Sequence, residues 1–437
     1  MSLPPQHGCL NRLLHESEAA IIRGTDRIGG ADIIQRARIL ADGLQLFRGS
    51  RVAVVSPHPE QIVIALAAAE LAGCSIVLHR SGELPEQLAD RWAVSAVVDA
   101  SLEIGVRSRG CVEAFNPCVC IPTSGTTGEP KLVQQTMAAL LGRIRRQPSE
   151  ARMRWLLTYH PATFGGLQVI LTALHDATDL IVVSQPSIRL LRDAALFHAV
   201  THISGTPTFW RAFLMALGDR TCELKLKQIT LGGEIADESI LRTLRTKFPH
   251  TPIRHIYAST EAGSLFSVRD GRPGFPADWL ETGADGVGLR VMDGVLQVRS
   301  PRVMLGYATP GESVMTDDGW LITGDQVELV GDRVYFRGRQ DSILNIGGAK
   351  VRPEEVEDAI LRLKGIADAY VYGVPNPLTG MVIAADIVLA PGESAGDLRQ
   401  AITSQLRTSL ESYKIPRLIK FVESITLTPA GKKQKSK

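Results

Sequence analysis

The sequence carries little net charge of either sign. Its 48 lysines and arginines nearly balance its 46 aspartates and glutamates, and the formal net charge is +2 over 437 residues. A surface that binds nucleic acid or an anionic membrane usually shows a marked excess of basic residues. The composition therefore supports neither of these partners, and a small-molecule ligand is the better hypothesis.

Cysteine is scarce and scattered, which is typical of reduced thiols in a cytoplasmic protein rather than of a disulfide framework. Two of the six cysteines are separated by one residue, but no second Cys or His pair follows at the spacing of a zinc site. In a strand these two side chains share a face, so we expect them to be buried as small hydrophobic groups. The six are Cys9, Cys74, Cys111, Cys118, Cys120 and Cys222.

Long uninterrupted hydrophobic runs are also missing. The first 18 residues contain no continuous apolar segment, so no signal peptide is expected. The most apolar stretch, residues 62–78, carries Glu70 near its centre and is flanked by strand-like runs. A core helix followed by a strand explains this stretch better than a membrane span does. No internal repeat is visible, and a cytoplasmic location is expected.

Length and hydrophobic patterning predict an α/β protein of two or three domains. Residues 51–79 read as strand, helix and strand, and the same alternation continues from about residue 155 to residue 258. Such alternation predicts parallel sheets covered by helices. Short strands and turns rich in Gly, Asp and Pro follow residue 263 and predict an antiparallel region. From residue 341 onward the pattern predicts a compact α+β domain.

The stretch most specific for function is IPTSGTTGEPK at residues 121–131. Glycines and small hydroxyl side chains let a backbone wrap closely around a phosphate and offer it many N–H and O–H donors. A Walker A loop is excluded, because Pro130 stands where that motif needs glycine and Leu132 follows the lysine. A polyphosphate loop of another class is predicted. Its candidate ligands are Thr123, Ser124, Gly125, Thr126, Thr127, Gly128 and Lys131.

This loop resembles the signature loop of the adenylate-forming superfamily, which comprises acyl- and aryl-CoA synthetases, peptide-synthetase adenylation domains and luciferases. Further matches follow in the family's order, and ordered matches are harder to obtain by chance than a single one. They are GGE at 232–234, YASTE at 257–261, TGD at 323–325, GRQDSILNIGGAKVRPEEVE at 338–357 and LTPAGKKQK at 427–435.

The resemblance implies a domain division and a reaction. Residues 1–338 would form an N-terminal domain of stacked parallel α/β subdomains plus a small antiparallel β region, residues 339–341 a hinge, and residues 342–437 a mobile α+β lid. The reaction would be ATP-dependent activation of a carboxylic acid to an acyl-adenylate, with pyrophosphate release. Transfer to a thiol of CoA or of a carrier-protein pantetheine would follow. Two anions must meet in the first step, so the site needs positive charge more than a general base.

The family's catalytic lysine is implied at Lys432, in the segment TPAGKKQK. A single mobile ammonium could reach the charge that develops between the carboxylate and the α-phosphate. Lys433 is the alternative register. Taken without the resemblance, a basic tail is more often a solvated segment.

The resemblance assigns two acidic residues to the nucleotide and its metal. Glu261 would bind Mg²⁺ and Thr260 would donate near the α-phosphate, although a Thr-Glu pair is also a common helix cap. Asp325 would accept the ribose hydroxyls with help from Arg339. The second Gly-Asp pair, ending at Asp332, is expected to be only a hairpin turn.

Further ATP contacts are implied for an aromatic residue and for the GGE motif. Tyr257 would pack near adenine and the ribose. Gly232 and Gly233 would let a flat ring approach closely, with adenine or the acyl group as the candidate ligand. Glu234 is the less secure member of this motif.

An acyl pocket is expected beside the strand ends. His160 stands where many family members gate this pocket, but a packed core histidine explains it equally well. No aspartate follows Phe164, where peptide-synthetase domains pair one with an α-amino group, so an α-amino acid substrate is disfavoured. Two adjacent glycines favour an aryl or extended acyl group. The expected lining is Tyr159, His160, Phe164, Gly165, Gly166, Thr206, Pro207 and Ala258.

The thiol-transfer step rests on the resemblance alone. Asp341 would be the pivot of the lid, since a few residues can absorb a large backbone change. Gly347 and Gly348 would line a tunnel for pantetheine. Luciferase-like oxidation is the less favoured second step.

The phosphate loop begins earlier in this chain than in most family members, so the first subdomain is abbreviated. Short o-succinylbenzoate-CoA ligases share this plan, which makes an aryl acid the runner-up substrate. A homodimer is left open, because some dimer surface could be missing. The rival from another class is a non-catalytic relative that binds nucleotide or acyl ligand, and the presence of Lys432, Glu261 and Asp325 argues against it.

Overall fold

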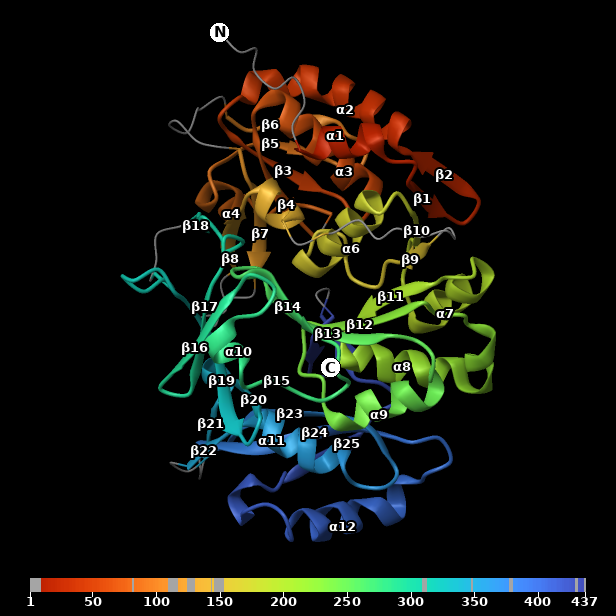
Figure 1. The fold of residues 1–437 in the computed structure, drawn as a ribbon, viewed down its shortest axis with the longest axis vertical. Helices are drawn as coiled ribbons and strands as arrows, with labels where there is room; N and C mark the ends of the chain where they lie inside the picture. Colours follow the sequence, from red (N-terminus) through yellow and green to blue (C-terminus); the bar gives the residue numbers. More distant parts are fainter. Residues whose placement is uncertain are drawn as a thin grey trace.

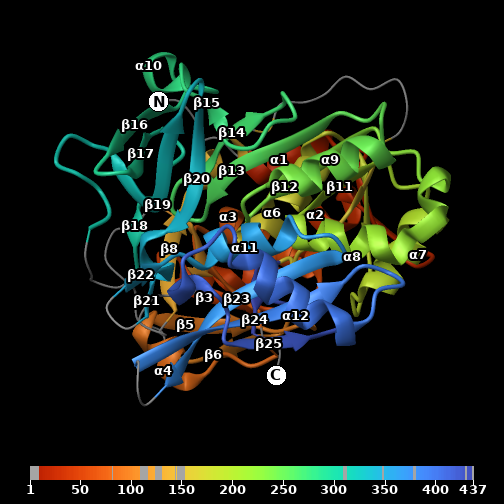
Figure 2. The same ribbon diagram turned by 90° about the horizontal axis from the view of Figure 1, so that it is seen from below.

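The computed structural model describes residues 9–80, 82–108, 117–123, 130–142, 144, 153–308, 313–346, 349–376, 380–428 and 431–435. These residues form a large N-terminal domain built on three sheets and a small C-terminal α+β domain (Figure 1). The mixed α/β fold class predicted from the sequence is confirmed. The small domain lies below the large one in Figure 1, and Figure 2 views the molecule from that side.

The first sheet is built on the strand–helix–strand unit predicted over residues 51–79. Its strand order is β18-β8-β7-β4-β3-β5-β6, and the central strands β7, β4, β3 and β5 are parallel. Strand β3 is buried along its whole length, as expected of a parallel strand covered on both faces. Its elements are β3 (Arg51–Val55), α3 (Pro59–Ala72), β4 (Ser75–His79), α4 (Glu86–Arg91), β5 (Val94–Val98), β6 (Ile104–Val106), β7 (Val119–Thr123), β8 (Lys131–Gln135), α5 (Met137–Leu141) and β18 (Gly306–Tyr307).

The second sheet has the order β14-β13-β12-β11-β9-β10-β1-β2, with antiparallel strands only at its two edges. Strands β1 and β2 come from the N-terminal segment, where no strand was predicted. Its elements, with the two N-terminal helices, are α1 (Cys9–Glu16), β1 (Ala20–Arg23), β2 (Asp26–Gly29), α2 (Gly30–Leu44), β9 (Arg154–Leu156), α6 (Phe164–His175), β10 (Asp179–Val182), α7 (Ile188–Phe197), β11 (His202–Gly205), α8 (Pro207–Leu217), β12 (Gln228–Gly232), α9 (Glu238–Lys247), β13 (Ile253–Ser259) and β14 (Gly263–Val268).

Four helices of the second sheet begin at side-chain caps. Thr163, Ser187, Thr206 and Asp237 each accept a hydrogen bond from the backbone N–H three residues further on. Such caps satisfy N–H groups that the first helical turn leaves without a partner. They fix where the chain turns from each strand end into the next helix, and this edge of the sheet carries most of the predicted site.

The third sheet is antiparallel, as predicted, with the order β15-β20-β19-β17-β16. Strands β19 and β20 form a hairpin whose turn contains Asp332, so the hairpin reading of this Gly-Asp pair is confirmed. Strand β20 leads through a short 3₁₀ helix, η3 (Gln340–Ser342), into the small domain. The other elements are β15 (Phe275–Pro276), α10 (Trp279–Thr282), β16 (Gly288–Met292), β17 (Val295–Arg299), β19 (Leu321–Val330) and β20 (Arg333–Arg339).

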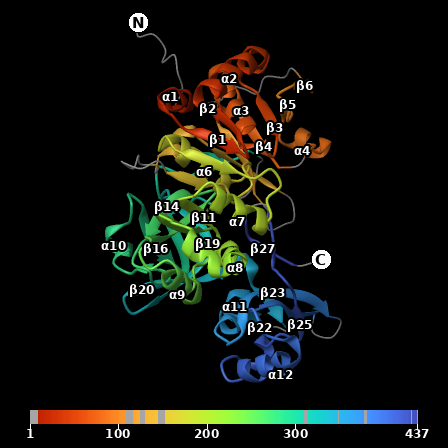
Figure 3. The same cartoon turned by 90° about the vertical axis from the view of Figure 1, so that its right-hand side faces the viewer.

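The small domain packs two helices against a three-stranded sheet around its own hydrophobic core. The end of the chain, with β27, leaves this domain and lies beside the large one (Figure 3). Its elements are β21 (Leu344–Ile346), β22 (Ala349–Val351), α11 (Pro353–Leu361), β23 (Ile366–Asn376), β24 (Gly380–Leu389), α12 (Ala395–Leu406), η4 (Ser412–Lys414), β25 (Leu418–Phe421), β26 (Thr426–Leu427) and β27 (Lys433–Gln434).

The structure bears out the expected burial of Cys118 and Cys120. Both side chains are buried, and their sulfurs lie 3.5 Å apart. Within the described part of the chain, no three His, Cys, Asp or Glu side chains are grouped as a metal site would require. None of the helices in that part of the chain has the length and apolar character needed to cross a bilayer.

Acid should destabilise the fold in part through His202. Burial, helped by the charges of Arg254 and Lys227, lowers the pKa of His202 to about 4. Between about pH 6.5 and pH 4, His202 is therefore protonated in the unfolded chain but neutral in the folded protein. The free energy of unfolding falls as the pH drops through this range. We expect His202→Gln to remove about 1–3 kcal/mol of this pH dependence.

The measurement is the free energy of unfolding in urea at several pH values, for both proteins. The comparison with the variant is needed because burial raises the pKa of Glu357 to about 7, which acts in the opposite direction. Parallel curves for the two proteins would contradict the assignment to His202.

Candidate active site

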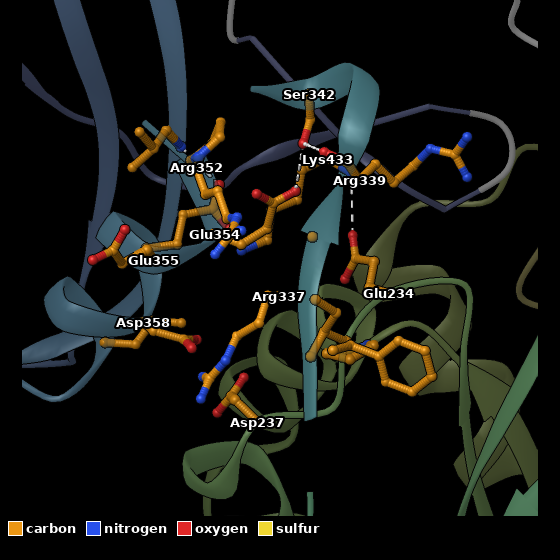
Figure 4. Close-up of a pocket in the computed structure, with 18 of the residues that line it drawn as sticks. Glu234, Asp237, Arg337, Arg339, Ser342, Arg352, Glu354, Glu355, Asp358 and Lys433 are labelled. Carbon is orange, nitrogen blue, oxygen red and sulfur yellow. Dashed lines mark hydrogen bonds and ion pairs between the residues drawn. The ribbon is translucent and has the colours of Figure 1, made fainter. Parts of the chain in front are cut away.

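A cleft of about 1340 Å³ lies between the two domains (Figure 4). Its large-domain wall comes from the carboxyl ends of β12 and β13 and from the β19–β20 hairpin, and its small-domain wall from α11 and β23. Ligands of open α/β sheets gather at such strand ends. The sequence-predicted residues that line it are Pro207, Gly233, Glu234, Tyr257, Ala258, Asp325, Arg339, Asp341, Lys432 and its alternative Lys433.

Asp325 and Tyr257 meet in this cleft, although 68 residues separate them. The Tyr257 hydroxyl donates a hydrogen bond to Oδ2 of Asp325, and Arg339 Nη1 lies 3.4 Å from Oδ1. Burial raises the pKa of Asp325, while the bond from Tyr257 and the charges of Arg339 and Lys432 oppose this effect. The Tyr257 ring stacks on Phe336 with ring centroids 4.8 Å apart. An acidic acceptor thus stands beside a flat aromatic surface, which is a combination that suits a nucleoside.

The predicted phosphate loop is carried by the β7–β8 hairpin. Thr123 and Lys131 are paired on the two strands at the point where the connecting loop begins and ends. The intervening predicted ligands, Ser124, Gly125, Thr126, Thr127 and Gly128, lie outside the described residues.

Glu261 lies opposite this hairpin, in the turn between β13 and β14. Its negative charge acts on the Tyr307 hydroxyl, and Lys131 Nζ lies 5.2 Å from the centroid of the Tyr307 ring. Burial, and then the negative charge of Glu261, raises the pKa of Tyr307 to about 12. One carboxylate and one ammonium group are therefore gathered around a single phenol at the base of the phosphate loop.

Thr260 is held in place through its main chain. Its carbonyl oxygen accepts a hydrogen bond of 2.9 Å from Nε2 of Gln135, a fully buried residue at the end of β8. This bond ties the Thr260 turn to the hairpin that carries the phosphate loop.

The two adjacent lysines near the C-terminus have different surroundings. Lys432 lines the cleft, and its charge acts on Asp325. The ammonium of Lys433 instead lies inside the small domain, 3.0 Å from Asp368 Oδ1 and 2.5 Å from the carbonyl oxygen of Ala369. Of the two registers that the sequence left open, the geometry favours Lys432 as the lysine that a ligand in the cleft could reach.

Glu234 is occupied by protein donors. One oxygen accepts from the backbone N–H and the hydroxyl of Thr208, at 3.0 and 2.8 Å, and the other accepts from the backbone N–H of Lys433 at 3.1 Å (Figure 4). These contacts favour a structural role at the domain junction over the predicted contact with ATP. Gly233 has the left-handed backbone conformation that favours glycine, at φ +85°, and a Cβ there would meet Thr206 at an ordinary contact distance of 3.5 Å, so the close approach of a flat ring stays a prediction.

Most of the predicted acyl-pocket residues lie outside the walls of the cleft. The Tyr159 hydroxyl is 3.5 Å from the carbonyl oxygen of Gly232, and its ring packs beside Gly165 and Gly431. Thr206 is the N-cap of α8. Tyr159 and Thr206 therefore lie next to Gly431, in the turn that carries Lys432.

The surroundings of His160 bear on whether it gates the acyl pocket or is a packed core histidine. Burial, helped by the charge of Arg80, lowers the pKa of His160 to about 4, so the ring is neutral near pH 7. Its Nδ1 accepts from the backbone N–H of Ala162 at 3.2 Å. Phe164, the first residue of α6, packs against the hydrophobic core of the large domain.

Gly166 shows the largest steric constraint in the predicted pocket. A Cβ there would overlap the carbonyl oxygen of His160 and lie 2.8 Å from its carbonyl carbon. Since the obstacle is backbone, we expect Gly166→Ala to lower the free energy of unfolding by about 2–3 kcal/mol. Gly165→Ala is the control, because its Cβ would meet only the Tyr159 ring, at 3.4 Å. Thermal unfolding of both variants checks the prediction, and equal losses would contradict it.

The predicted hinge lies beside the nucleotide residues. Asp341 is in η3, and its carboxylate receives Arg339 Nε at 3.0 Å. Arg339 is thus shared between Asp325 and Asp341. Gly347 and Gly348, predicted for the thiol tunnel, lie outside the described residues.

Sequence reasoning missed Tyr307 and Arg211. Tyr307 carries no motif, and its place beside Glu261 depends on the pairing of β18 with β8. Arg211 could have been recognised from the sequence, because it is the only charged residue in the α8 segment PTFWRAFLMAL. An isolated arginine among apolar helix positions indicates a buried ion pair.

Comparison with known proteins agrees with the class that this fold and cleft define. The profile of the AMP-binding enzyme family matches residues 76–308, and that of the AMP-binding enzyme C-terminal domain matches residues 355–432. The first match alone spans more than half of the 437 residues. The chain therefore belongs to the AMP-binding enzyme family.

Curated relatives share about a quarter of their residues with this chain. A fatty acid–acyl-carrier-protein ligase of Mycobacterium marinum is 26% identical over 88% of this chain and 86% of its own length. A 3-hydroxybenzoate–CoA ligase of Aromatoleum sp. is 28% identical over 72% of this chain. A 2-succinylbenzoate–CoA ligase of Bacillus velezensis is 28% identical over 91% of this chain and 89% of its own length.

Coverage of the relatives varies. The chain spans 63% of a CoA ligase of Rhodococcus jostii and 64% of the 3-hydroxybenzoate–CoA ligase, which is less than two thirds of each. Among solved structures, ATP-bound MatB from Rhodopseudomonas palustris has a TM-score of 0.75 at 21% identity, over 97% of this chain and 96% of its own. The o-succinylbenzoate CoA synthetase from Bacillus subtilis has a TM-score of 0.74 at 22% identity, over 99% and 97%.

Proposed function

We propose that this protein is an ATP- and Mg²⁺-dependent acid–thiol ligase. It joins a carboxylic acid to AMP with release of pyrophosphate, and then passes the acyl group to the thiol of CoA or of a carrier-protein pantetheine. The observation that carries the proposal is the position of Lys432, which lines the cleft together with Asp325 and Arg339 and whose positive charge acts on Asp325. A site for adenylation needs such a positive charge where carboxylate and α-phosphate meet.

The chain's own residues divide the work of the first step. Asp325 and Tyr257 hold the nucleoside by its ribose hydroxyls and base, and Lys131 and the β7–β8 loop hold the β- and γ-phosphates. Lys432 orients the attacking carboxylate against the α-phosphate and offsets the negative charge that develops there. The bond from the α-phosphorus to the bridging oxygen breaks as the bond to the carboxylate oxygen forms, and pyrophosphate leaves with the electron pair.

The residues present fit a magnesium ion held largely by phosphate. Mg²⁺ is usually bound by one or two carboxylates together with substrate phosphates. Glu261 supplies one carboxylate beside the phosphate-loop hairpin, and the described residues provide no all-protein metal cage that would compete with it. When bound, the ion would neutralise charge on the phosphates.

Thiol transfer would use a second orientation of the small domain. The domain division at residues 339–341 and the pivot at Asp341 are part of this proposal, supported by the change from strand β20 to the short η3 helix at that point. Both kinds of acceptor occur among the relatives, which include CoA ligases and acyl-carrier-protein ligases.

Aryl and fatty acids are the two substrate classes that the names of the relatives suggest. The 2-succinylbenzoate–CoA ligase is matched over 89% of its length, whereas the 3-hydroxybenzoate–CoA ligase is matched over 64%. A fatty acid–acyl-carrier-protein ligase of Mycobacterium marinum is matched over 86% of its length, so a succinylbenzoate-like acid and a fatty acid are the first compounds to test.

The test is acid-dependent pyrophosphate release from ATP and Mg²⁺, with aryl, fatty and amino acids and with hydroxylamine to trap the acyl-adenylate. Release with one class of acid, together with a hydroxamate of the same acid, is the expected result. ATP binding without release for every acid would overturn the proposal and favour a non-catalytic ligand-binding role.

A further inference from the structure

A cluster of buried charges joins the two domains directly beside Lys432. It combines four acidic and two basic side chains, and most of them are largely shielded from water. We call it the interdomain cluster. Its members are Glu234, Arg211 and Asp237 of the large domain, and Glu357, Asp368 and Lys433 of the small domain.

Arg211 forms the first link across the junction. It projects from α8, and only 8% of its side chain is exposed. One end of its guanidinium is paired with Asp237, the N-cap of α9, and Nη1 lies 3.7 Å from Oδ1 of Asp368 on β23. The helix α8 and the strand β23 are thereby connected through one buried cation.

Lys433 forms the second link. Its ammonium lies 3.0 Å from the same Asp368 oxygen and 3.5 Å from Glu357 Oε2, and 11% of its side chain is exposed. Its backbone N–H donates to Glu234 at 3.1 Å (Figure 4). Lys433 is thus bound to the small domain by its side chain and to the large domain by its main chain.

These two links fix the main chain next to Lys432. Consecutive Cα atoms are about 3.8 Å apart, so a residue adjacent to Lys433 has little freedom to leave the cleft. Gly431 adds a third constraint on the other side, because an ideal Cβ there would lie 2.9 Å from Thr206. A buried pair resists separation because either partner alone would be left uncompensated.

We propose that Arg211, Asp368 and Lys433 are positioning residues for the adenylation step, holding the small domain in the orientation that places Lys432 against the α-phosphate. The charged groups of all three are paired with one another or with neighbours in the interdomain cluster. The inference rests on the proposed function and adds to it which residues select the adenylation orientation. It predicts that weakening the cluster harms adenylation while sparing thiol transfer.

The test compares the two half-reactions in Arg211→Gln. Adenylation is measured as single-turnover pyrophosphate release, and transfer as the reaction of a synthetic acyl-adenylate with pantetheine, the group that CoA and carrier proteins share. We expect adenylation to fall about 10- to 100-fold, as displaced catalytic groups do, and transfer to change less than about twofold. Arg211→Lys retains the charge and is expected to recover part of the loss.

The matched control is Arg220→Gln, which removes an exposed arginine shortly after α8 whose ion partner is Glu223. Both half-reactions of this control should remain at the wild-type rate. Equal losses in the two half-reactions of Arg211→Gln, or no loss in either, would overturn the inference. Absence of adenylation in the wild type would instead count against the proposed function.

A second measurement does not require enzymatic activity, and it uses two variants so that the test survives if one of them fails to fold. Spin labels on Cys222 of the large domain and on an introduced Arg407→Cys in the small domain report the interdomain distance, once Cys9 and Cys111 are replaced by serine. We expect a narrow distance distribution with wild-type Arg211 and a broader one with either Arg211→Gln or Asp368→Asn. Unchanged distributions in both variants would overturn the inference whatever the enzyme assays show.

Discussion

Replacement of Lys432 with alanine is expected to lower kcat for acid-dependent pyrophosphate release about 10²- to 10³-fold. Lys432 lines the cleft within the electrostatic reach of Asp325, so its ammonium can offset charge that appears only as the acyl-phosphate bond forms. A group that acts in this way affects kcat more than KM. Steady-state pyrophosphate release with varied ATP and acid is the measurement, and the thermal midpoint should stay close to that of the wild type.

The neighbouring lysines provide the contrast that makes this result specific. Lys433→Ala would leave Glu357 buried without its cation and Asp368 with Arg211 alone, and should cost about 3–5 kcal/mol of stability. Lys435→Ala removes an ammonium that lies over the Tyr372 ring, 5.1 Å from its centroid, and should change neither activity nor stability appreciably. A Lys432→Ala enzyme with wild-type kcat would exclude the assigned role.

The sequence was sufficient to predict the layers of the large domain, because buried parallel strands and covering helices leave a strong pattern. The unit at residues 51–79 and the alternation that follows it both appear in the structure. The antiparallel hairpins were equally visible, since Asp332 stands in a turn between two short alternating strands. The strands β1 and β2 were missed, because four-residue strands at a sheet edge carry too little periodicity to be recognised.

The nucleotide side of the site could be assigned from motifs because each motif is a short continuous segment. Asp325 lies within β19 and Tyr257 within β13, on different sheets, yet both residues line the cleft. The domain junction could not be assigned in this way. Arg211, Asp368 and Lys433 come from three distant segments, and their meeting depends on how the two domains are oriented, which no local pattern in the sequence encodes.

Glu234 illustrates how a motif can be located correctly while its chemistry stays unsettled. The resemblance placed the GGE motif at the end of β12, beside the cleft. Only the structure shows that Thr208 and Lys433 occupy both carboxylate oxygens. A carboxylate with those partners contributes more to holding the C-terminal segment than to contacting a ligand.

Asp325→Ala is expected to lower kcat/KM for ATP about 10- to 100-fold, which is the range for losing a charged hydrogen-bond partner. Asp325 is buried and accepts from the Tyr257 hydroxyl, so its loss also leaves that phenol without its partner. Asp332→Ala is the matched control, because it removes the aspartate of the other Gly-Asp pair, whose ion partner Arg272 is exposed. Pyrophosphate release at varied ATP concentration distinguishes the two. Similar kinetics for both variants would mean that the two Gly-Asp turns are equivalent and that the ribose is held elsewhere. A loss confined to Asp325→Ala would show that burial beside Tyr257 gives one of two identical dipeptides its role in the site.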